Sequence, residues 1–426
     1  MSVASPSPSA GADPDASDEP SEAIPGLAGR RFLIISAPFG SYSRKLACVL
    51  RANGAVVRRM IFNAGDLLDW GSRDAVKFRR GGDAWPHALA GLAETYTDLV
   101  LFGEAGVYNQ TVIEQAERLK ASVWVIENGY FRPHWVTMER NGVNARSTLP
   151  RSADGYPAPA PREPPFQEAG TILPHHVWNL ARYHTVQVAG RVLFPRYVRP
   201  YTRHALVQAG GHAWRYLKLR LASPLATDTD VIAERGPFFI TCLQREGDTT
   251  LLRYSDYVTN TAFLEHVVAD FATHAPPQAR LVVKNHPLDP GLVNYQAVVR
   301  RLARRHALEG RVDFIDGGNL AALCRASLGM VVNNSTAALS AVGFGTPVKV
   351  LGQAFFDFEG LTDQQPLSRF WTAPQTPDHD LYVRFREHVL HRTQINGSYH
   401  NPAMQDVTAR RMAMAFAGGW DRAQVQ

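Results

Sequence analysis

Short apolar segments of β-strand type recur along this chain, and several of them end abruptly in polar residues. Residues 281–287 end in Lys-Asn-His-Pro, and residues 330–336 end in Asn-Asn-Ser-Thr. Helical patterns separate the apolar runs. This alternation is typical of parallel α/β domains, which bind their ligands at the carboxyl ends of the strands. The pattern therefore predicts an α/β fold with a ligand site at these strand ends.

The length and composition favour more than one core. A chain of 426 residues with 45% hydrophobic content is long enough for two α/β domains. Residues 1–26 are rich in Ser, Pro, Ala, Asp and Glu, so we expect a disordered tail there. We expect an N-terminal, acceptor-side Rossmann-like domain at 27–225, a C-terminal Rossmann-like nucleotide-sugar domain at 226–400, and a C-terminal helix at 401–426.

The individual elements can be placed by their periodicity and by the turn residues that bound them. In the first domain we expect strands at 32–37, 55–62, 99–103 and 123–126, with helices at 44–52 and 109–119. In the second we expect strands at 238–243, 279–284, 312–315, 329–333 and 347–351, with a helix at 256–273. Two Rossmann-like domains facing each other across a cleft form the GT-B arrangement, and we expect this fold.

The cysteines and the hydropathy pattern indicate in which cellular compartment the protein is expected. Cys48, Cys242 and Cys324 are far apart and follow no CxxC or Cys/His spacing, so neither a disulfide framework nor a zinc site is expected. A reducing cytoplasm fits this pattern. The sequence shows no leader pattern and no apolar run of roughly 18 residues. We therefore expect a cytoplasmic protein that is soluble or peripheral to a membrane surface.

The net charge of +6 is unevenly distributed. No acidic residue lies between Glu168 and Asp228, and basic residues alternate there with aromatic ones. Such a block suits an anionic membrane interface, where rings lie at the headgroup level. The alternatives are that the rings are core and the arginines solvated or paired, or that the block binds nucleic acid, for which no recognised motif is present. The block contains Trp178, Arg182, Tyr183, Arg191, Phe194, Arg196, Tyr197, Arg199, Tyr201, Arg203, Trp214, Arg215, Tyr216, Lys218 and Arg220.

The polar residues at the two strand ends of the second domain are suited to an anion. Lys284 and His286 are two residues apart on an extended segment and project to the same side, and Pro287 prevents a helix from continuing. Ser335 and Thr336 precede a predicted helix, whose free N–H groups would favour a phosphate. The alternative is an ordinary helix cap beside a buried histidine. Together the two motifs predict a phosphate site.

Other residues at strand ends have both a binding and a structural interpretation. Gln244 and Asp248 follow a strand and either hold the nucleoside and sugar hydroxyls or cap the turn. Arg132 either pairs with a substrate carboxylate or forms a salt bridge with Glu127 or Glu139. The absence of GxGxxG and GxxxxGKS argues against a dinucleotide oxidoreductase and a P-loop ATPase.

Several ordered segments resemble the capsule polysaccharide biosynthesis and export proteins of the KpsS/LipB type. The resemblance spans roughly residues 30–400. The segments are 63–66, 127–133, 137–139, 142–144, 242–248, 284–288, 334–336, 347–352, 360–362 and 393–398.

This resemblance implies a retaining β-Kdo transferase that uses CMP-Kdo. Such an enzyme would build the Kdo linker on a phosphatidylglycerol lipid at the cytoplasmic face of the inner membrane. His286, Pro287, Ser335 and Thr336 match family residues that would hold the CMP phosphate. Donors aimed at a leaving phosphate stabilise the transition state more than the ground state. No cofactor and no metal would be required.

Retention of configuration needs a carboxylate on the face of the sugar opposite the leaving group. Glu127 follows a predicted strand and begins a segment that resembles the family's acidic-acidic-Gly motif, but Asn128 occupies the second acidic position. We therefore expect Glu127 and His286 to be catalytic. Asn128 and Arg132 are expected to contact substrate, together with Lys284, Pro287, Ser335, Thr336, Gln244 and Asp248.

Two alternatives remain beside the Kdo transferase. One is a transferase that uses another CMP-ulosonic acid. The other is a catalytically silent scaffold of a capsule assembly or export complex. Asn128 favours this alternative, and so does the segment around Glu104, which lacks the Arg and the His that the family resemblance leads us to expect. The expected partners are a nucleotide sugar, an anionic lipid acceptor, the inner-membrane surface and, in the scaffold case, other capsule proteins; nucleic acid is not expected.

Overall fold

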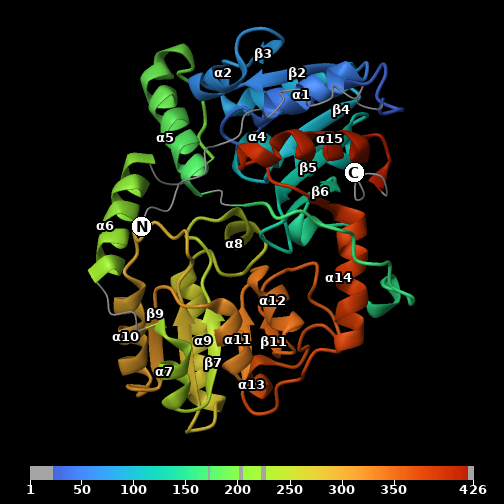
Figure 1. Ribbon diagram of the computed structural model, residues 1–426. Helices are drawn as coiled ribbons and strands as arrows, with labels where there is room; N and C mark the ends of the chain where they lie inside the picture. The colour runs from blue at the N-terminus through green and yellow to red at the C-terminus, as the bar shows by residue number, and fades with distance from the viewer. Residues whose placement is uncertain (1–22, 171–172, 201–204, 222–226, 421–426) are drawn as a thin grey trace, which may run out of the picture.

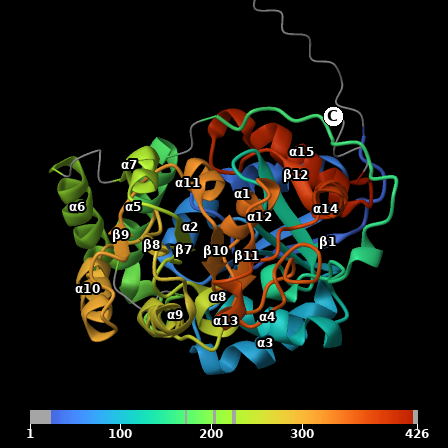
Figure 2. The ribbon, with the colours of Figure 1, turned by 90° about the horizontal axis from the view of Figure 1, so that it is seen from below.

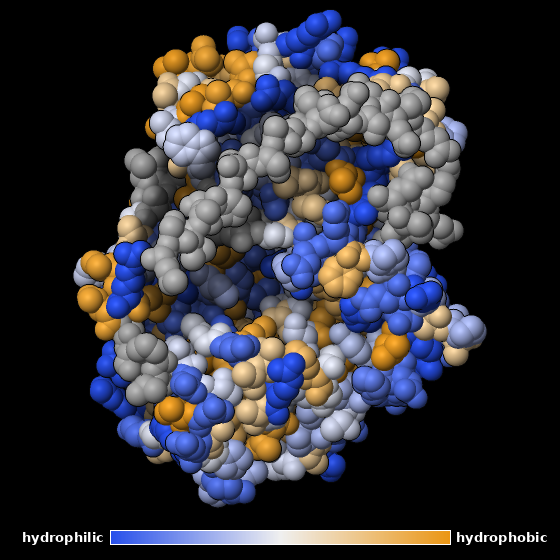
Figure 3. Space-filling model, in the orientation of Figure 1, coloured by the Kyte–Doolittle hydropathy of each residue, from blue (hydrophilic) through white to orange (hydrophobic). Residues whose placement is uncertain are grey.

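Two sheets, one above the other in Figure 1, organise the chain. The computed structural model describes residues 23–170, 173–200, 205–221 and 227–420. Most of the predicted tail, and Tyr201 and Arg203 of the basic block, therefore lie outside the described residues. Figure 3 shows that the surface is hollowed between the upper and lower halves of the molecule. The predicted α/β fold with two Rossmann-like domains is confirmed.

The upper sheet has the strand order β12-β6-β5-β4-β1-β2-β3. Strands β1 to β5 are parallel, whereas β6 is antiparallel to both β5 and β12. The sequence patterns did not predict this antiparallel edge. The strands are β1 (Arg31–Ile34), β2 (Val56–Ile61), β3 (Ala75–Lys77), β4 (Asp98–Phe102), β5 (Ser122–Asn128), β6 (Trp135–Arg140) and β12 (Gln394–Asn396).

Both faces of the upper sheet are covered, because alternate residues of its strands point to opposite sides. Phe32 and Ile34 pack under α1 and α15, whereas Leu33 and Ile35 pack with α3 and α4. The helices are α1 (Tyr42–Ala52), α2 (Ala64–Trp70), α3 (Trp85–Thr95), α4 (Gly106–Gln115) and α15 (Gln405–Phe416).

The lower sheet is entirely parallel, with the strand order β11-β10-β7-β8-β9. Its strands are short apolar runs buried on both faces, as the sequence pattern predicts. The strands are β7 (Phe238–Cys242), β8 (Arg280–Lys284), β9 (Val312–Ile315), β10 (Gly329–Val332) and β11 (Val348–Val350).

Helices cover the lower sheet on both sides. Thr259 begins α9 by accepting a hydrogen bond from the Ala262 N–H at 3.1 Å, so the helix starts four residues after the predicted position. The helices are α8 (Thr249–Arg253), α9 (Asn260–His274), α10 (Tyr295–Arg305), α11 (Leu320–Ala326), α12 (Ala337–Gly343), α13 (Leu367–Phe370) and α14 (His379–Thr393).

The connection between the halves contains α5 (Leu173–Ala189), α6 (Ala205–Leu221) and α7 (Thr229–Glu234). Helices α5 and α6 follow one another along the left edge in Figure 1, and Figure 2 shows α6 at the outer edge beside α10. None of the helices in the described ranges has both the length and the apolar character needed to span a bilayer.

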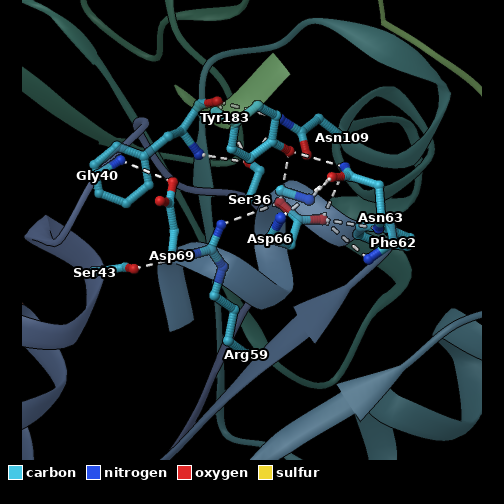
Figure 4. A network of polar contacts seen from close by, with 12 residues as sticks. Ser36, Gly40, Ser43, Arg59, Phe62, Asn63, Asp66, Asp69, Asn109 and Tyr183 are labelled. Atoms are coloured by element: carbon cyan, nitrogen blue, oxygen red, sulfur yellow. Dashed lines mark hydrogen bonds and ion pairs between the residues drawn. The ribbon is translucent and has the colours of Figure 1, made fainter. Parts of the chain in front are cut away.

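A buried polar network attaches α5 to the upper domain (Figure 4). The Tyr183 hydroxyl donates to Asp66 Oδ1 at 2.8 Å, and Arg59, which is 1% exposed, donates to the same oxygen at 3.1 Å. Arg182 forms an ion pair with Asp69 at 2.5 Å. Tyr183, which the sequence places in the basic block, is therefore core, and Arg182 is paired.

The chain returns to the upper domain after completing the lower one. Strand β12 pairs with β6, and α15 packs against α1. Residues 394–396 lie within the range 226–400 predicted for the second domain, but they belong to the upper sheet. The predicted boundary at residue 400 therefore differs from the structure, because backbone pairing of so short a strand depends on a partner that the sequence does not indicate.

Candidate functional site

The candidate site lies where strand ends of the two domains face each other. Glu127 and Asn128 end β5 of the upper sheet, and Asp248 and His286 follow β7 and β8 of the lower one. The charge of Asp248 raises the pKa of Glu127, and that of Arg132 lowers the pKa of His286. Burial is the main cause of both shifts.

Contacts between the domains lie at the same place. Arg253 of α8 pairs with Glu114 of α4. Asn144 of the upper domain and Thr336 of the lower one line one recess.

Glu127 is half-buried at the end of β5. Burial raises its pKa, while the hydrogen bond from the Asn128 N–H to Oε1, 3.0 Å long, and the charge of Arg132 act in the opposite direction. Gly103 leaves space for the carboxylate, since a Cβ there would lie 3.3 Å from Glu127 Oε2. A partly desolvated carboxylate beside a cation is suited to nucleophilic or electrostatic catalysis.

Asn128 and Arg132 flank this carboxylate. The Asn128 side chain accepts a hydrogen bond from the buried Tyr399 hydroxyl at 2.9 Å, so it is held in place by the returning C-terminal segment. Arg132 donates to the Gly129 carbonyl oxygen at 3.3 Å and forms no ion pair within 4.0 Å with Glu127 or Glu139 in the described residues. Its contact with a substrate anion stays a prediction.

His286 follows β8 and is neutral at pH 7 in this structure. Burial lowers its pKa to about 4, an effect that the charges of Arg132 and Arg245 reinforce and that of Asp248 opposes. Its Nδ1 accepts a hydrogen bond from the Leu288 N–H at 3.0 Å. The ring proton therefore lies on Nε2. His286 can thus offer an N–H donor to a phosphate oxygen.

Lys284 and Pro287 lie on either side of this histidine. Lys284 is 5% exposed, and burial lowers its pKa; Cys242, Asp316 and Cys324 are among the groups that act on it electrostatically. This ammonium is therefore surrounded largely by the interior of the lower domain. Pro287 is exposed. Phosphate contacts by these two residues remain predictions.

The sequence did not single out Arg215 for the site, although this residue holds the His286 loop. Its guanidinium, on α6, donates to the carbonyl oxygens of His286 at 3.1 Å, Pro287 at 2.8 Å and Asp289 at 2.7 Å. It also pairs with Asp316, with Nε 2.9 Å from Oδ2. A planar guanidinium with several donors in fixed geometry is suited to hydrogen-bonding several carbonyl oxygens of one loop at once.

Gln244 and Asp248, which follow β7, have structural contacts. Asp248 Oδ1 accepts hydrogen bonds from the N–H and the hydroxyl of Thr250 and so caps α8. Gln244 Nε2 donates to Asn334 at 2.7 Å and to Thr250 at 2.9 Å, while its buried Oε1 has no partner among the described residues. That oxygen is available to a ligand donor.

Ser335 and Thr336 are half-buried in front of α12. The Ser335 hydroxyl accepts a weak hydrogen bond from the Ala337 N–H at 3.3 Å, and Thr336 makes no capping hydrogen bond with its side chain. Thr336 lines a narrow recess between the domains, together with Asn144, Tyr254 and Asn334. The hydroxyls are therefore placed near the cleft and are largely uncommitted.

The loops that carry His286 and Ser335 are not adjacent. The carboxyl ends of β8 and β10 lie at the same edge of the lower sheet, but β7 lies between the two strands. Gln244, at the end of β7, connects to the second loop through Asn334. A phosphate shared by His286 and Ser335 would therefore also lie over the loop that follows β7.

Two further carboxylates near the cleft have strongly perturbed pKa values. Burial raises the pKa of Glu104 and that of Glu139 to about 7. Glu139 accepts hydrogen bonds from Tyr130 and Ser147, both at 2.5 Å. Glu104 accepts one from the Val143 N–H at 3.0 Å, and its carboxyl group also interacts with the Tyr254 hydroxyl of the lower domain. Their burial is what distinguishes these two glutamates from the exposed carboxylates of the chain. Burial cannot be read from the sequence, so the sequence did not single them out for the site.

Metal ligands were not expected from the sequence. Across the described residues, no group of three or more His, Cys, Asp or Glu side chains is placed to hold a metal ion.

Two Rossmann-like domains with polar and titratable groups at their strand ends define a GT-B-like fold. The model of the family of capsule polysaccharide biosynthesis proteins matches residues 97–400. The capsule polysaccharide modification protein LipB of Neisseria meningitidis serogroup A is 34% identical over 388 residues, covering 87% of this chain and 91% of that protein. The chain belongs to this capsule polysaccharide biosynthesis family, as its sequence motifs indicate.

Other relatives are more distant. The capsule polysaccharide export protein KpsS of Escherichia coli is 28% identical over 392 residues, covering 88% of this chain and 98% of that protein. Among solved structures, the β-Kdo 2,7 transferase KpsC of Thermosulfurimonas dismutans is 15% identical with a TM-score of 0.42, covering 91% of this chain and 99% of that one.

Proposed function

We propose that this protein is a retaining glycosyltransferase that transfers Kdo from CMP-Kdo to an anionic, phosphatidylglycerol-type lipid in capsule polysaccharide synthesis. The single observation that carries the proposal is that Glu127 and His286 lie at strand ends of different domains, which meet at one cleft. Burial raises the pKa of Glu127 and lowers that of His286. A sugar held between the domains would have a carboxylate on one side and a phosphate-binding group on the other.

His286 supports departure of CMP. Its Nε2–H would donate to the phosphate oxygen on which negative charge grows as the glycosidic bond breaks. The hydroxyls of Ser335 and Thr336 would contact the same phosphate group. A neutral histidine in this position gains hydrogen-bond energy as the charge develops, so its contribution is larger in the transition state than in the ground state.

Glu127 supports retention. Its carboxylate would attack the anomeric carbon as the bond to the CMP oxygen breaks. The acceptor hydroxyl would then displace Glu127 and pass its proton to the phosphate of the released CMP. Asn128 cannot take this role, because an amide is a poor nucleophile and its oxygen already accepts the Tyr399 hydroxyl. The catalytic carboxylate would therefore be Glu127 rather than the residue at the second position of the motif.

The test is release of CMP from CMP-Kdo in the presence of a lipid acceptor. We expect His286→Ala to lower turnover by about 100-fold or more, because removing one preorganised donor has an effect of that order. We expect Glu127→Gln to abolish turnover and Asn128→Ala, which removes a neighbour of Glu127 but not the carboxylate, to retain part of it. His274→Ala, a substitution of an exposed histidine on α9, is the matched control. Full activity of His286→Ala or Glu127→Gln would refute the assigned site.

A catalytically silent scaffold is the second candidate. The specific observation in its favour is Asn128, whose amide is engaged by Tyr399 where family resemblance predicts a carboxylate. This candidate predicts that wild-type protein binds CMP, CDP or UDP in a calorimetric titration without turnover of any CMP-sugar. The enzyme proposal instead predicts a preference for CMP over CDP and UDP, together with turnover. Turnover of a CMP-ulosonic acid other than CMP-Kdo would correct only the sugar.

A further inference from the structure

Helix α6 presents its apolar side outward and a charged side inward. Val207, Trp214, Leu217 and Leu221 recur at helical spacing and are 51%, 58%, 50% and 80% exposed. Arg215, by contrast, is 6% exposed and is engaged by the lower domain. A surface helix of a soluble domain normally has the opposite arrangement. The outward stripe of α6 therefore needs an explanation other than packing within this chain.

The preceding helix repeats this arrangement. Trp178, Val188 and, in the turn that follows α5, Val192 are spaced to lie on one side and are 70%, 45% and 85% exposed. The opposite side of α5 carries Tyr183, which the buried network of Figure 4 attaches to the upper domain. Arg182 is paired with Asp69, which leaves no free arginine or lysine among the described residues of this helix. Figure 3 shows hydrophobic groups at the left edge of the molecule, over α5 and α6.

The charged residues that α5, α6 and the segment between them contribute have one sign. No acidic residue occurs between Glu168 and Asp228. Lys218 lies over the ring of Trp214, with Nζ 5.1 Å from the centroid. Helix α10, beside α6 in Figure 2, adds exposed arginines. The exposed cations along α5, α6 and the segment between them are Arg191, Arg196, Arg199, Lys218 and Arg220.

We propose that the α5–α6 surface, formed by the two apolar stripes and these five cations, docks on an anionic lipid bilayer. Exposed Trp, Val and Leu side chains would enter the boundary between headgroups and acyl chains, and Arg and Lys would contact lipid phosphates. Charge complementarity favours an anionic bilayer as the binding partner of this surface. A second copy of the same surface would bring like charges together, whereas an anionic bilayer matches both the cations and the apolar stripes.

Docking of this kind would place the cleft relative to the membrane. Helix α6 carries the exposed stripe on one side and Arg215, which holds the His286 loop, on the other. A bilayer bound to the outer side would therefore lie one helix away from the candidate donor site. The inference rests on exposure and charge alone, so it does not depend on the proposed chemistry.

The experiment is flotation of the full chain with vesicles of phosphatidylcholine, with or without phosphatidylglycerol. We expect binding only to vesicles with phosphatidylglycerol, weakened by added salt. Lys218→Glu with Arg220→Glu should reduce the partition coefficient by about 25-fold or more, since each cation near such a surface contributes roughly fivefold. Trp214→Ser with Leu217→Ser should reduce it by about tenfold or more, because both exposed apolar side chains lose their insertion into lipid.

Matched controls separate docking from general surface effects. Arg58→Glu alters an exposed cation on β2, and Val258→Ser with Leu328→Ser alters exposed apolar residues of the lower domain. These variants should bind as wild type does. Unchanged binding by the α6 variants, equal binding to neutral vesicles, or a dimer in solution that the α6 variants abolish without any vesicle binding would each overturn the proposal.

Discussion

At the scale of single residues, the cleft holds glutamates whose surroundings differ in burial. Glu127 is half-buried and lies beside Arg132, whereas Glu104 is 4% exposed. Burial raises the pKa of Glu104 to about 7. Burial also raises the pKa of Glu127, so both carboxyl groups bind a proton more readily than an exposed glutamate does.

We expect Glu104→Gln to change the pH dependence of stability. Because burial raises the pKa of Glu104 from 4.5 to about 7, the folded state binds more protons than the unfolded state between these values, and the free energy of unfolding falls as pH rises. Glutamine does not titrate. The stability of the variant relative to wild type should therefore increase by up to about 3 kcal/mol between about pH 5 and pH 8.

Urea unfolding across this pH range measures the effect. Glu94→Gln, which replaces an exposed glutamate paired with Lys120, is the control and should show no such trend. If the curves of Glu104→Gln and wild type stay parallel at all pH values, Glu104 is not a buried acid with a raised pKa.

At the scale of elements, the two sides of helix α6 have different environments: the inner side contacts the lower domain, and the outer side is exposed. Arg215 lies on the inner side and fixes the loop of residues 286–289 through three carbonyl oxygens. The backbone in that loop sets the direction of the His286 ring. The helix is thus a positioning element for the candidate donor site, although it lies outside the sheet that carries this site.

We expect Arg215→Gln to weaken the donor site without unfolding the protein. Losing the guanidinium releases the His286 loop, and a displacement of the order of 1 Å in such a group can cost about 100-fold in rate. Calorimetric titration should show at least a tenfold weaker affinity for CMP. Arg215→Lys, which keeps the charge but loses the planar donor set, should restore only part of it.

Arg220→Gln provides the control, because Arg220 is on the same helix but is exposed. It should bind CMP as the wild type does. Equal CMP affinity of all three variants would show that Arg215 only supports the fold.

At the scale of the whole molecule, the C-terminal segment completes the N-terminal domain. Met412 and Ala409 of α15 are fully buried in the core that contains Phe32 and Leu46. The Phe416 ring lies 5.2 Å from that of Phe32. The core of the upper domain is therefore complete only when α15 has packed against it. The chain passes between the two domains twice, once in each direction.

We expect Met412→Ala to destabilise the upper domain by about 2 to 5 kcal/mol, as is typical when a buried methionine is truncated. Hydrogen exchange should then show lost protection in α1 and β1, more than 300 residues away in the sequence. Asp406→Ala on the same helix should cost at most about 1 kcal/mol, since Asp406 forms only an exposed ion pair with Lys45. Loss of protection confined to α15 would contradict this account.

The sequence alone predicted the strands and helices whose own apolar pattern requires them to be buried. The run at 312–315 is a strand at those residues, and the other buried runs of the lower sheet agree within two residues at either end. Apolar residues with period 2 or 3.6 must be buried whatever their partner is, so their pattern is visible locally. The family motifs likewise indicated Glu127 and His286, which lie at strand ends of different domains, and their roles stay predictions.

Only the tertiary structure decided the features that depend on a distant partner. The pairing of β12 with β6, the grip of Arg215 on the His286 loop and the hydrogen bond from Tyr399 to Asn128 all join segments far apart in the chain. The protonation of Glu104 and His286 depends on burial, which arises only when the domains close around them. A sequence records which groups are present, but the distance and the solvation that set their energies exist only after folding.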